Sequence, residues 1–149
     1  YRVLHFATHG LAVHEIPELS ALVLSQFSQV RGEDGYLRMP EIEQLRLQAD
    51  FVNLSACETG LGKLFRGEGV VGLAQAFLSA GANQVAVSLW QINDASSSKF
   101  MAALYRQPGN NYAHAVNEIK RQFIQGKFSM AYRHPYYWSP FIVYGRLQP

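Results

Sequence analysis

The chain has 149 residues, a length that suits one domain, and 48% of them are hydrophobic whereas 16% are charged. This balance is typical of a globular protein with a real core and excludes an intrinsically disordered chain. The formal net charge is only +2, and no apolar run approaches the ~20 residues that a membrane span requires. We therefore expect a globular domain that binds neither nucleic acid nor a membrane directly.

The predicted elements alternate between strands and helices. Apolar runs predict strands over residues 2–7, 21–24, 51–54, 84–89 and 141–144, with a short hairpin arm at Tyr36 and Leu37. Helical signals stand at residues 40–45, 70–80, 95–105 and 113–124. Such alternation predicts right-handed crossovers and an α/β fold in which helices flank a mostly parallel sheet.

Several helix ends carry sequence signals of their own. Pro40 opens the first helix, and Ile42 and Leu45 are expected on its inner face. The second helix is almost free of polar residues, so we expect both of its sides to be covered, and Gly81 is a stop signal after it. Asp94 is a candidate N-cap for the third helix.

Three predicted strands are followed by residues that can carry chemistry. His9 follows the first strand, and Cys57 follows the strand over 51–54. Trp90 and Asp94 lie in the loop after the strand over 84–89. Sites of parallel α/β sheets form at the carboxyl ends of the strands. If these strands are neighbours, the residues meet at one edge of the sheet.

His9 and Cys57 form the leading candidate site. A thiol has to become a thiolate before it attacks a carbonyl, and a nearby imidazole can take that proton and later return one to the leaving amine. The two residues are 48 positions apart (57 − 9), which a βα unit with a hairpin can bridge. The backbone N–H groups of Gly10 and Cys57 could together form an oxyanion hole.

The chain contains one cysteine, Cys57. No intrachain disulfide can form, which favours a reducing compartment, and we expect a cytoplasmic protein. A free cysteine is more commonly a small buried apolar residue than a nucleophile. A structural role for Cys57 therefore stays open at this point.

Nucleotide and metal motifs are incomplete. The Gly62–Lys63 pair lacks both the earlier glycine and the following Ser or Thr of a phosphate-binding loop. After His14, Glu18 stands where a zinc-protease helix requires its second histidine. We expect neither a metal nor another cofactor.

Five motifs follow one another along the chain. They are Phe6–Gly10 (FATHG), Leu54–Gly60 (LSACETG), Gly67–Val70 (GEGV) with Gly72–Ala74 (GLA), Ser88–Asp94 (SLWQIND) and His134–Phe141 (HPYYWSPF). Together they resemble the CHAT domain, a relative of caspases and separases that is often joined to TPR repeats in bacteria. The resemblance covers essentially the whole chain and implies a caspase-like fold.

The resemblance assigns roles to the candidate residues. The catalytic histidine and cysteine of the family correspond to His9 and Cys57, and the oxyanion donors of caspase-like enzymes to the N–H groups of Gly10 and Cys57. The resemblance thus implies a cysteine endopeptidase that cleaves protein or peptide substrates and is regulated by attached TPR-type repeats or by a partner protein.

Trp90 and Asp94 match a Trp-x-x-x-Asp stretch that separase has at the same distance after its cysteine. The match implies a substrate-binding loop in which Asp94 pairs with a basic P1 side chain. Separase continues with further acidic residues, whereas this chain continues with Ser96, Ser97 and Ser98. The helix cap is the competing role for Asp94.

The resemblance also bears on domain limits. Strands normally precede the histidine strand in this family, and we expect residues 1–149 to be the C-terminal catalytic part of a CHAT-type peptidase domain in a longer protein. Two other functions stay open. One is a catalytically silent caspase-like signalling or scaffold module, and the other is a small-molecule acyltransferase or hydrolase that uses the same pair of residues.

Overall fold

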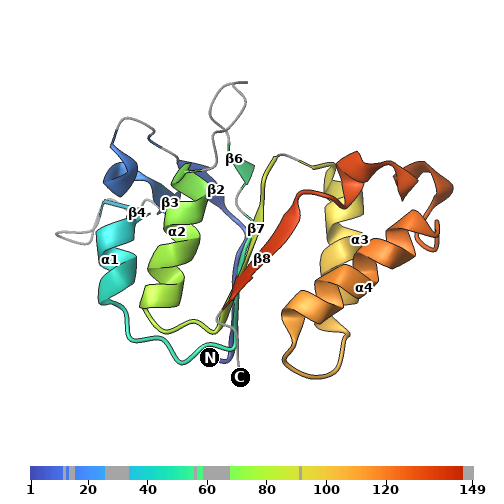
Figure 1. Cartoon of the computed structure of the whole chain (residues 1–149). Helices are drawn as coiled ribbons and strands as arrows, with labels where there is room; N and C mark the ends of the chain where they lie inside the picture. The colour runs from blue at the N-terminus through green and yellow to red at the C-terminus, as the bar shows by residue number, and fades with distance from the viewer. Residues whose placement is uncertain are drawn as a thin grey trace.

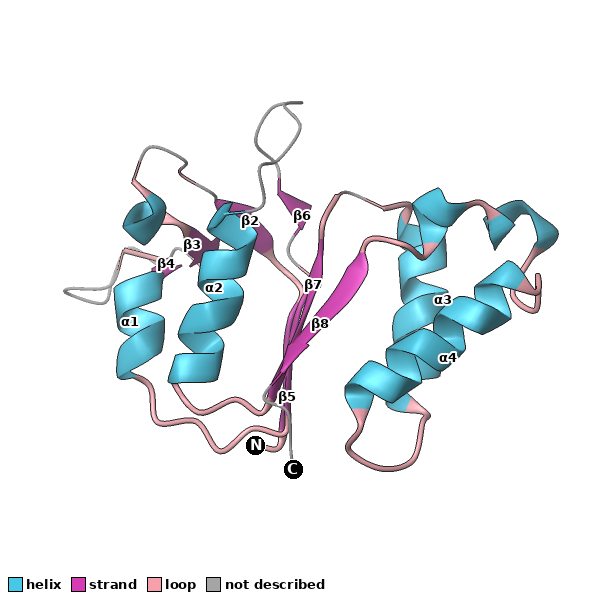
Figure 2. Cartoon of the chain, viewed as in Figure 1, coloured by secondary structure: helices cyan, strands magenta, loops and turns pink. Residues whose placement is uncertain are grey.

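Helices cover both faces of a central sheet (Figures 1 and 2). The structure, a computed structural model, describes residues 1–11, 13, 16–25, 34–55, 57–58, 68–90 and 92–145, and only the backbone at 17, 57–58 and 68–70. The helices are α1 (Met39–Gln44), α2 (Glu68–Ser79), α3 (Asp94–Tyr105) and α4 (Tyr112–Ile124). No helix in this part of the chain is both long and apolar enough to cross a membrane.

The central sheet has the strand order β1-β5-β7-β8. Its strands are β1 (Val3–Phe6), β5 (Phe51–Leu54), β7 (Gln84–Ser88) and β8 (Phe141–Gly145). The first three run parallel to one another, and β8 pairs antiparallel with β7. The predicted α/β fold with a mostly parallel sheet flanked by helices is therefore confirmed.

A second, smaller sheet has the order β4-β3-β2-β6. Its strands are β2 (His9–Leu11), β3 (Ala21–Val23), β4 (Tyr36–Arg38) and β6 (Cys57–Glu58). The expected hairpin arm is confirmed, because β3 and β4 pair antiparallel. The sequence analysis missed β2 and β6, since strands of three and two residues are too short to show periodicity.

The central sheet separates two apolar cores. One core lies between the sheet and α1 with α2, where Val52 and Phe77 are fully buried, and the other lies between the sheet and α3 with α4, where Phe51 and Phe100 are fully buried. All four residues of β5 are buried, as expected for a strand that is covered on both faces. Burial of each of these side chains contributes about 1.5–3 kcal/mol.

Two expectations about helix faces are wrong. Val71, Gln75 and Ser79 are exposed and lie four residues apart, so one side of α2 faces solvent instead of being covered. In α1, Ile42 is buried as expected, but Leu45 is 38% exposed. Leu45 is the C-cap residue and has extended backbone angles, so the helical periodicity no longer determines its direction.

Gly81 ends α2 as predicted. Its φ of 112° lies in the left-handed region, its N–H donates to the carbonyl of Leu78, and the N–H of Ala82 donates to the carbonyl of Phe77. These two bonds form a Schellman motif. A Cβ at Gly81 would also collide with the backbone carbonyl oxygen of Leu47. The position therefore requires glycine for its conformation and for the space around it.

Substitutions can separate the two reasons for glycine at Gly81, namely its left-handed backbone conformation and the lack of space for a Cβ. Gly81→Ala should destabilise the fold by about 2 kcal/mol or more, because it adds a backbone collision to the conformational strain. Gly109 has a φ of 90° and open space at its Cβ position, so Gly109→Ala should cost only about 1 kcal/mol of strain. Chemical denaturation of both variants measures the difference, and equal losses would contradict the proposed collision.

Candidate active site

The segment that contains β1 and β2 pairs in parallel with the segment that contains β5 and β6, first in the central sheet and then in the second sheet. In the central sheet β1 pairs in parallel with β5 from Val3↔Phe51 to Phe6↔Leu54. The N–H of Ser55 then donates to the carbonyl of Phe6 at 3.0 Å. In the second sheet β2 pairs in parallel with β6, and the register is His9↔Cys57. The offset is 48 residues in both sheets (51 − 3 and 57 − 9).

His9 lies on an inner strand of the second sheet, and its side chain is exposed. Its register partner on the other side is Val23, and the hydroxyl of the preceding Thr8 donates to the carbonyl of Val23. The structure thus places the backbones of His9 and Cys57 on neighbouring strands. The side chain of Cys57 is outside the described part, so the thiol–imidazole contact stays a prediction.

Gly10 lies one position further along β2. Its register partners are Leu22 on one side and Glu58 on the other. The position is next to the Cys57 backbone, as an oxyanion pair requires. The use of the Gly10 and Cys57 N–H groups as oxyanion donors remains a prediction.

Trp90 lies two residues beyond the end of β7, which is the third parallel strand of the central sheet. The Ser88 hydroxyl donates to the carbonyl of Trp90 at 2.7 Å. The indole Nε1–H donates to the carbonyl of Tyr136 at 3.2 Å. Trp90 is nevertheless 39% exposed, so a large side chain is held in place at the carboxyl end of the sheet.

The segment that holds Trp90 contains two short 3₁₀ helices, η2 (Met130–Arg133) and η3 (Pro135–Tyr137). Between them, Nδ1 of His134 accepts a hydrogen bond from the Tyr136 N–H at 3.3 Å. The sequence analysis used this tyrosine-rich segment only as one of the five motifs, His134–Phe141. Its link to the Trp90 loop was missed because a backbone carbonyl provides it, and no residue type signals such an acceptor.

Asn93 caps α3, whereas the sequence analysis assigned the cap to Asp94. The Asn93 side-chain oxygen accepts hydrogen bonds from the N–H groups of Ala95 and Ser96 at 3.1 and 3.3 Å. Asp94 is the first residue of the helix and is exposed. An acidic residue there interacts favourably with the helix dipole, but it does not satisfy the free N–H groups. The cap prediction for Asp94 is therefore wrong by one residue.

The sequence model of the CHAT domain family matches residues 1–146. The chain belongs to the CHAT domain family. This CHAT domain is also similar to Tetratricopeptide repeat protein 28 of Homo sapiens, with 30% identity over 145 residues that make up 97% of this chain and 5% of that protein. The Mus musculus protein of the same name is 34% identical over 110 residues, or 73% of this chain and 4% of that protein. The chain thus spans about one-twentieth of the length of these mammalian relatives.

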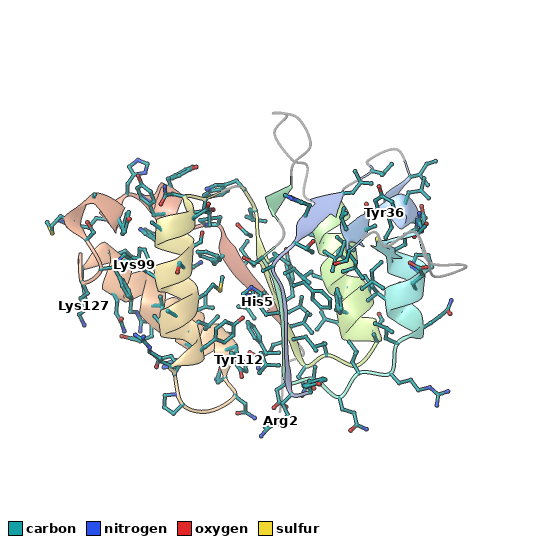
Figure 3. All side chains as sticks on the ribbon, turned by 180° about the vertical axis from the view of Figure 1, so that it is seen from behind. Arg2, His5, Tyr36, Lys99, Tyr112 and Lys127 are labelled. Carbon is teal, nitrogen blue, oxygen red and sulfur yellow. The ribbon has the colours of Figure 1, made fainter. Side chains whose placement is uncertain are left out.

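One buried polar side chain of this CHAT domain lies on β5, the strand that precedes Cys57. Asn53 of β5 is 2% exposed, and its amide nitrogen donates to the Tyr105 hydroxyl and contacts the Met101 sulfur, both at 3.1 Å. His5 is the register partner of Asn53 on β1 and contacts the Tyr105 ring with 5.6 Å between ring centres. Figure 3 shows His5 between the central sheet and α3.

Partial burial shifts the pKa values of His5 and Tyr105, although both side chains keep contact with solvent. It lowers the pKa of His5 below 6.5 and raises the pKa of Tyr105 above 10.0, although the Asn53 hydrogen bond opposes the shift of Tyr105. Both shifts favour the neutral forms. The sequence analysis missed the group because an asparagine in a four-residue apolar run gives no signal of its partners.

Two sequence features that were compared with nucleotide and metal motifs, the Gly62–Lys63 pair and His14, lie outside the described residues. Within the side chains that the structure describes, no three His, Cys, Asp or Glu residues gather as a metal site would require.

The cap assignment can be checked by two neighbouring substitutions. Asn93→Ala should destabilise the fold by about 1 kcal/mol, because the N–H groups of Ala95 and Ser96 lose their acceptor. Asp94→Ala should cost only a few tenths of a kcal/mol, since it removes a favourable but screened charge at the helix start and no cap. Thermal unfolding of both variants tests the assignment, and a larger loss for Asp94→Ala than for Asn93→Ala would return the cap to Asp94.

Proposed function

We propose that this CHAT domain is a cysteine endopeptidase in which Cys57 is the nucleophile and His9 is the base. The observation that carries the proposal is the parallel register of His9 with Cys57. Neighbouring strands lie ~4.8 Å apart, and register partners share a face of the sheet. This spacing suits a proton transfer between an imidazole and a thiol, which requires a heavy-atom distance of about 3 Å.

The proposed reaction has two stages. His9 takes the thiol proton of Cys57, the thiolate sulfur attacks the scissile carbonyl carbon, and the N–H groups of Gly10 and Cys57 donate to the oxyanion. The carbon–nitrogen bond then breaks, His9 returns the proton to the leaving amine, and a thioester remains. His9 next takes a proton from water, the hydroxide attacks the thioester, and the acid product leaves as the thiol is restored.

A peptide is the proposed substrate. His9 and Trp90 are both exposed, which favours an open binding surface over the narrow apolar pocket that a small-molecule acyltransferase would need. The fixed indole of Trp90 provides an apolar wall beside the site. Asp94 is the proposed partner of a basic P1 side chain, and the identification of Asn93 as the cap leaves its carboxylate available for that role.

The attachment of this domain to repeats is also part of the proposal. Both relatives are named for tetratricopeptide repeats, which supports regulation of the peptidase by attached TPR-type repeats or by a partner that binds them. A catalytic thiol has to stay reduced, so we place the protein in the cytoplasm.

The first test is cleavage profiling of a whole proteome. The full protein should produce new peptide termini that Cys57→Ala and His9→Ala both eliminate, with rates on an isolated substrate falling by about 10³-fold or more. His114→Ala is the matched control, because His114 is an exposed histidine on α4. Identical cleavage patterns for the full protein and Cys57→Ala would overturn the peptidase assignment and favour a catalytically silent signalling or scaffold module.

The second test addresses the P1 residue. Because Asn93 and not Asp94 caps α3, Asp94→Asn changes the charge at the site without removing the cap. The rate of cleavage after Arg should fall about tenfold, the loss expected when a charge-assisted hydrogen bond becomes a neutral one. Cleavage after Leu should be unchanged. Steady-state kinetics on two peptides that differ only at P1 decide the question, and equal rates for the parent and the variant on both peptides would remove Asp94 from the specificity site.

A further inference from the structure

The outer edge of β8 presents backbone groups that β7 does not use. The N–H of Leu89 donates to the carbonyl of Pro140 at 3.1 Å, which sets the phase of the antiparallel ladder. Backbone groups alternate between the two sides of a strand, so those of Ile142 and Tyr144 face β7. Those of Phe141 and Val143 face the other way. No strand in the described part of the chain pairs with this edge.

A groove runs between this edge and α4. Its volume is about 210 Å³, and it combines one stripe of the helix with three consecutive residues of β8. The helix stripe is built at spacings of three and four residues, which places it on one face. The lining residues are Ala113, Val116, Asn117 and Lys120 of α4 and Phe141, Ile142 and Val143 of β8.

Lys120 supplies the charge of the groove. Its side chain is half-buried, and its Nζ reaches the carbonyl oxygen of Ser139 at 3.5 Å, the long limit of a hydrogen bond. No described carboxylate forms an ion pair with it, although Arg121 on the next position pairs with Glu118. Burial lowers the pKa of the Lys120 ammonium because it loses hydration. An acidic group entering the groove would restore a favourable partner for this charge.

We propose that the groove between α4 and β8 binds an extended peptide segment of another protein, which adds to β8 as a new strand and sets an acidic side chain against Lys120. The backbone of the peptide pairs with Phe141 and Val143, and its alternate side chains enter the apolar part of the groove. This site does not depend on the peptidase proposed above, because it uses neither His9 nor Cys57.

Size and shape favour a peptide over a small molecule. Pockets for small molecules usually measure ~300–1,000 Å³ and enclose most of the ligand, whereas this groove is smaller. Strand addition needs only a free edge and room for one or two side chains, since backbone hydrogen bonds provide much of the affinity. The Lys120 charge then selects among peptides, because a like charge in the same position would be repelled.

The test starts from a displayed library of random ten-residue peptides selected on the full protein. Val143→Pro removes an N–H that points away from β7, so it should block strand addition while leaving the β7–β8 pairs in place. Lys120→Glu reverses the charge of the groove. Lys127→Glu is the matched control, because Lys127 is exposed and lies beyond the end of α4, away from the central sheet (Figure 3).

The expected result is a set of selected peptides with Asp or Glu at one fixed position. Val143→Pro and Lys120→Glu should each weaken their binding at least tenfold, measured by fluorescence anisotropy, whereas Lys127→Glu should leave it unchanged. A peptide with Lys in place of its acidic residue should regain binding to Lys120→Glu. If Val143→Pro does not fold, the combination of Lys120→Glu with the Lys-containing peptide still tests the proposal.

Hydrogen exchange adds a readout that requires no substitution. A bound peptide should slow amide exchange at Phe141 and Val143, while Ile142 and Tyr144 should be protected with or without it. The proposal is overturned if no peptide is enriched, if Lys127→Glu weakens binding as much as Lys120→Glu, or if these two outward amides are unaffected. It is also overturned if Val143→Pro only abolishes self-association, because the occupant of the edge is then a second copy of the chain.

Discussion

The pairing of β1 with β5 is the constraint on which the rest of the candidate site depends. A parallel ladder fixes the relative position of two chain segments, and here the same offset continues from the central sheet into the second one. The distance between His9 and Cys57 is therefore set by hydrogen bonds of the main chain before any side-chain interaction is considered. The helices on both faces hold these strands in place by burying all four residues of β5.

Much of the central architecture follows from local sequence. Apolar runs predicted β5 and β7 nearly to the residue, and the helical signal over residues 113–124 identified α4, where Val116, Ile119 and Phe123 are buried. These elements are long enough to bury a periodic face, so local pattern and tertiary packing agree. The family resemblance then supplied what periodicity cannot, namely which histidine and which cysteine belong together.

The features that the sequence concealed have a common physical reason. The strand of His9 (β2) and the strand of Cys57 (β6) are too short to show a hydrophobic periodicity. They form because the longer strands before them, β1 and β5, align the two chain segments. The cap of α3 was predicted at Asp94 but is Asn93. Both residue types cap well, and only the backbone geometry distinguishes them. The indole N–H of Trp90 is fixed by the backbone carbonyl of Tyr136. Because every residue has a backbone carbonyl, the sequence gives no signal for this acceptor.

Asn53 has a consequence for how the chain avoids misfolding. Among the four buried residues of β5, it is the one polar side chain, and Tyr105 and Met101 satisfy it on the α3 side of the sheet. If β5 slipped by one residue against β1, every side chain of the strand would change faces. The amide would then enter the apolar core beside α2 without a partner, at a cost of about 1–3 kcal/mol. A single asparagine thus discriminates against the alignment that would separate His9 from Cys57.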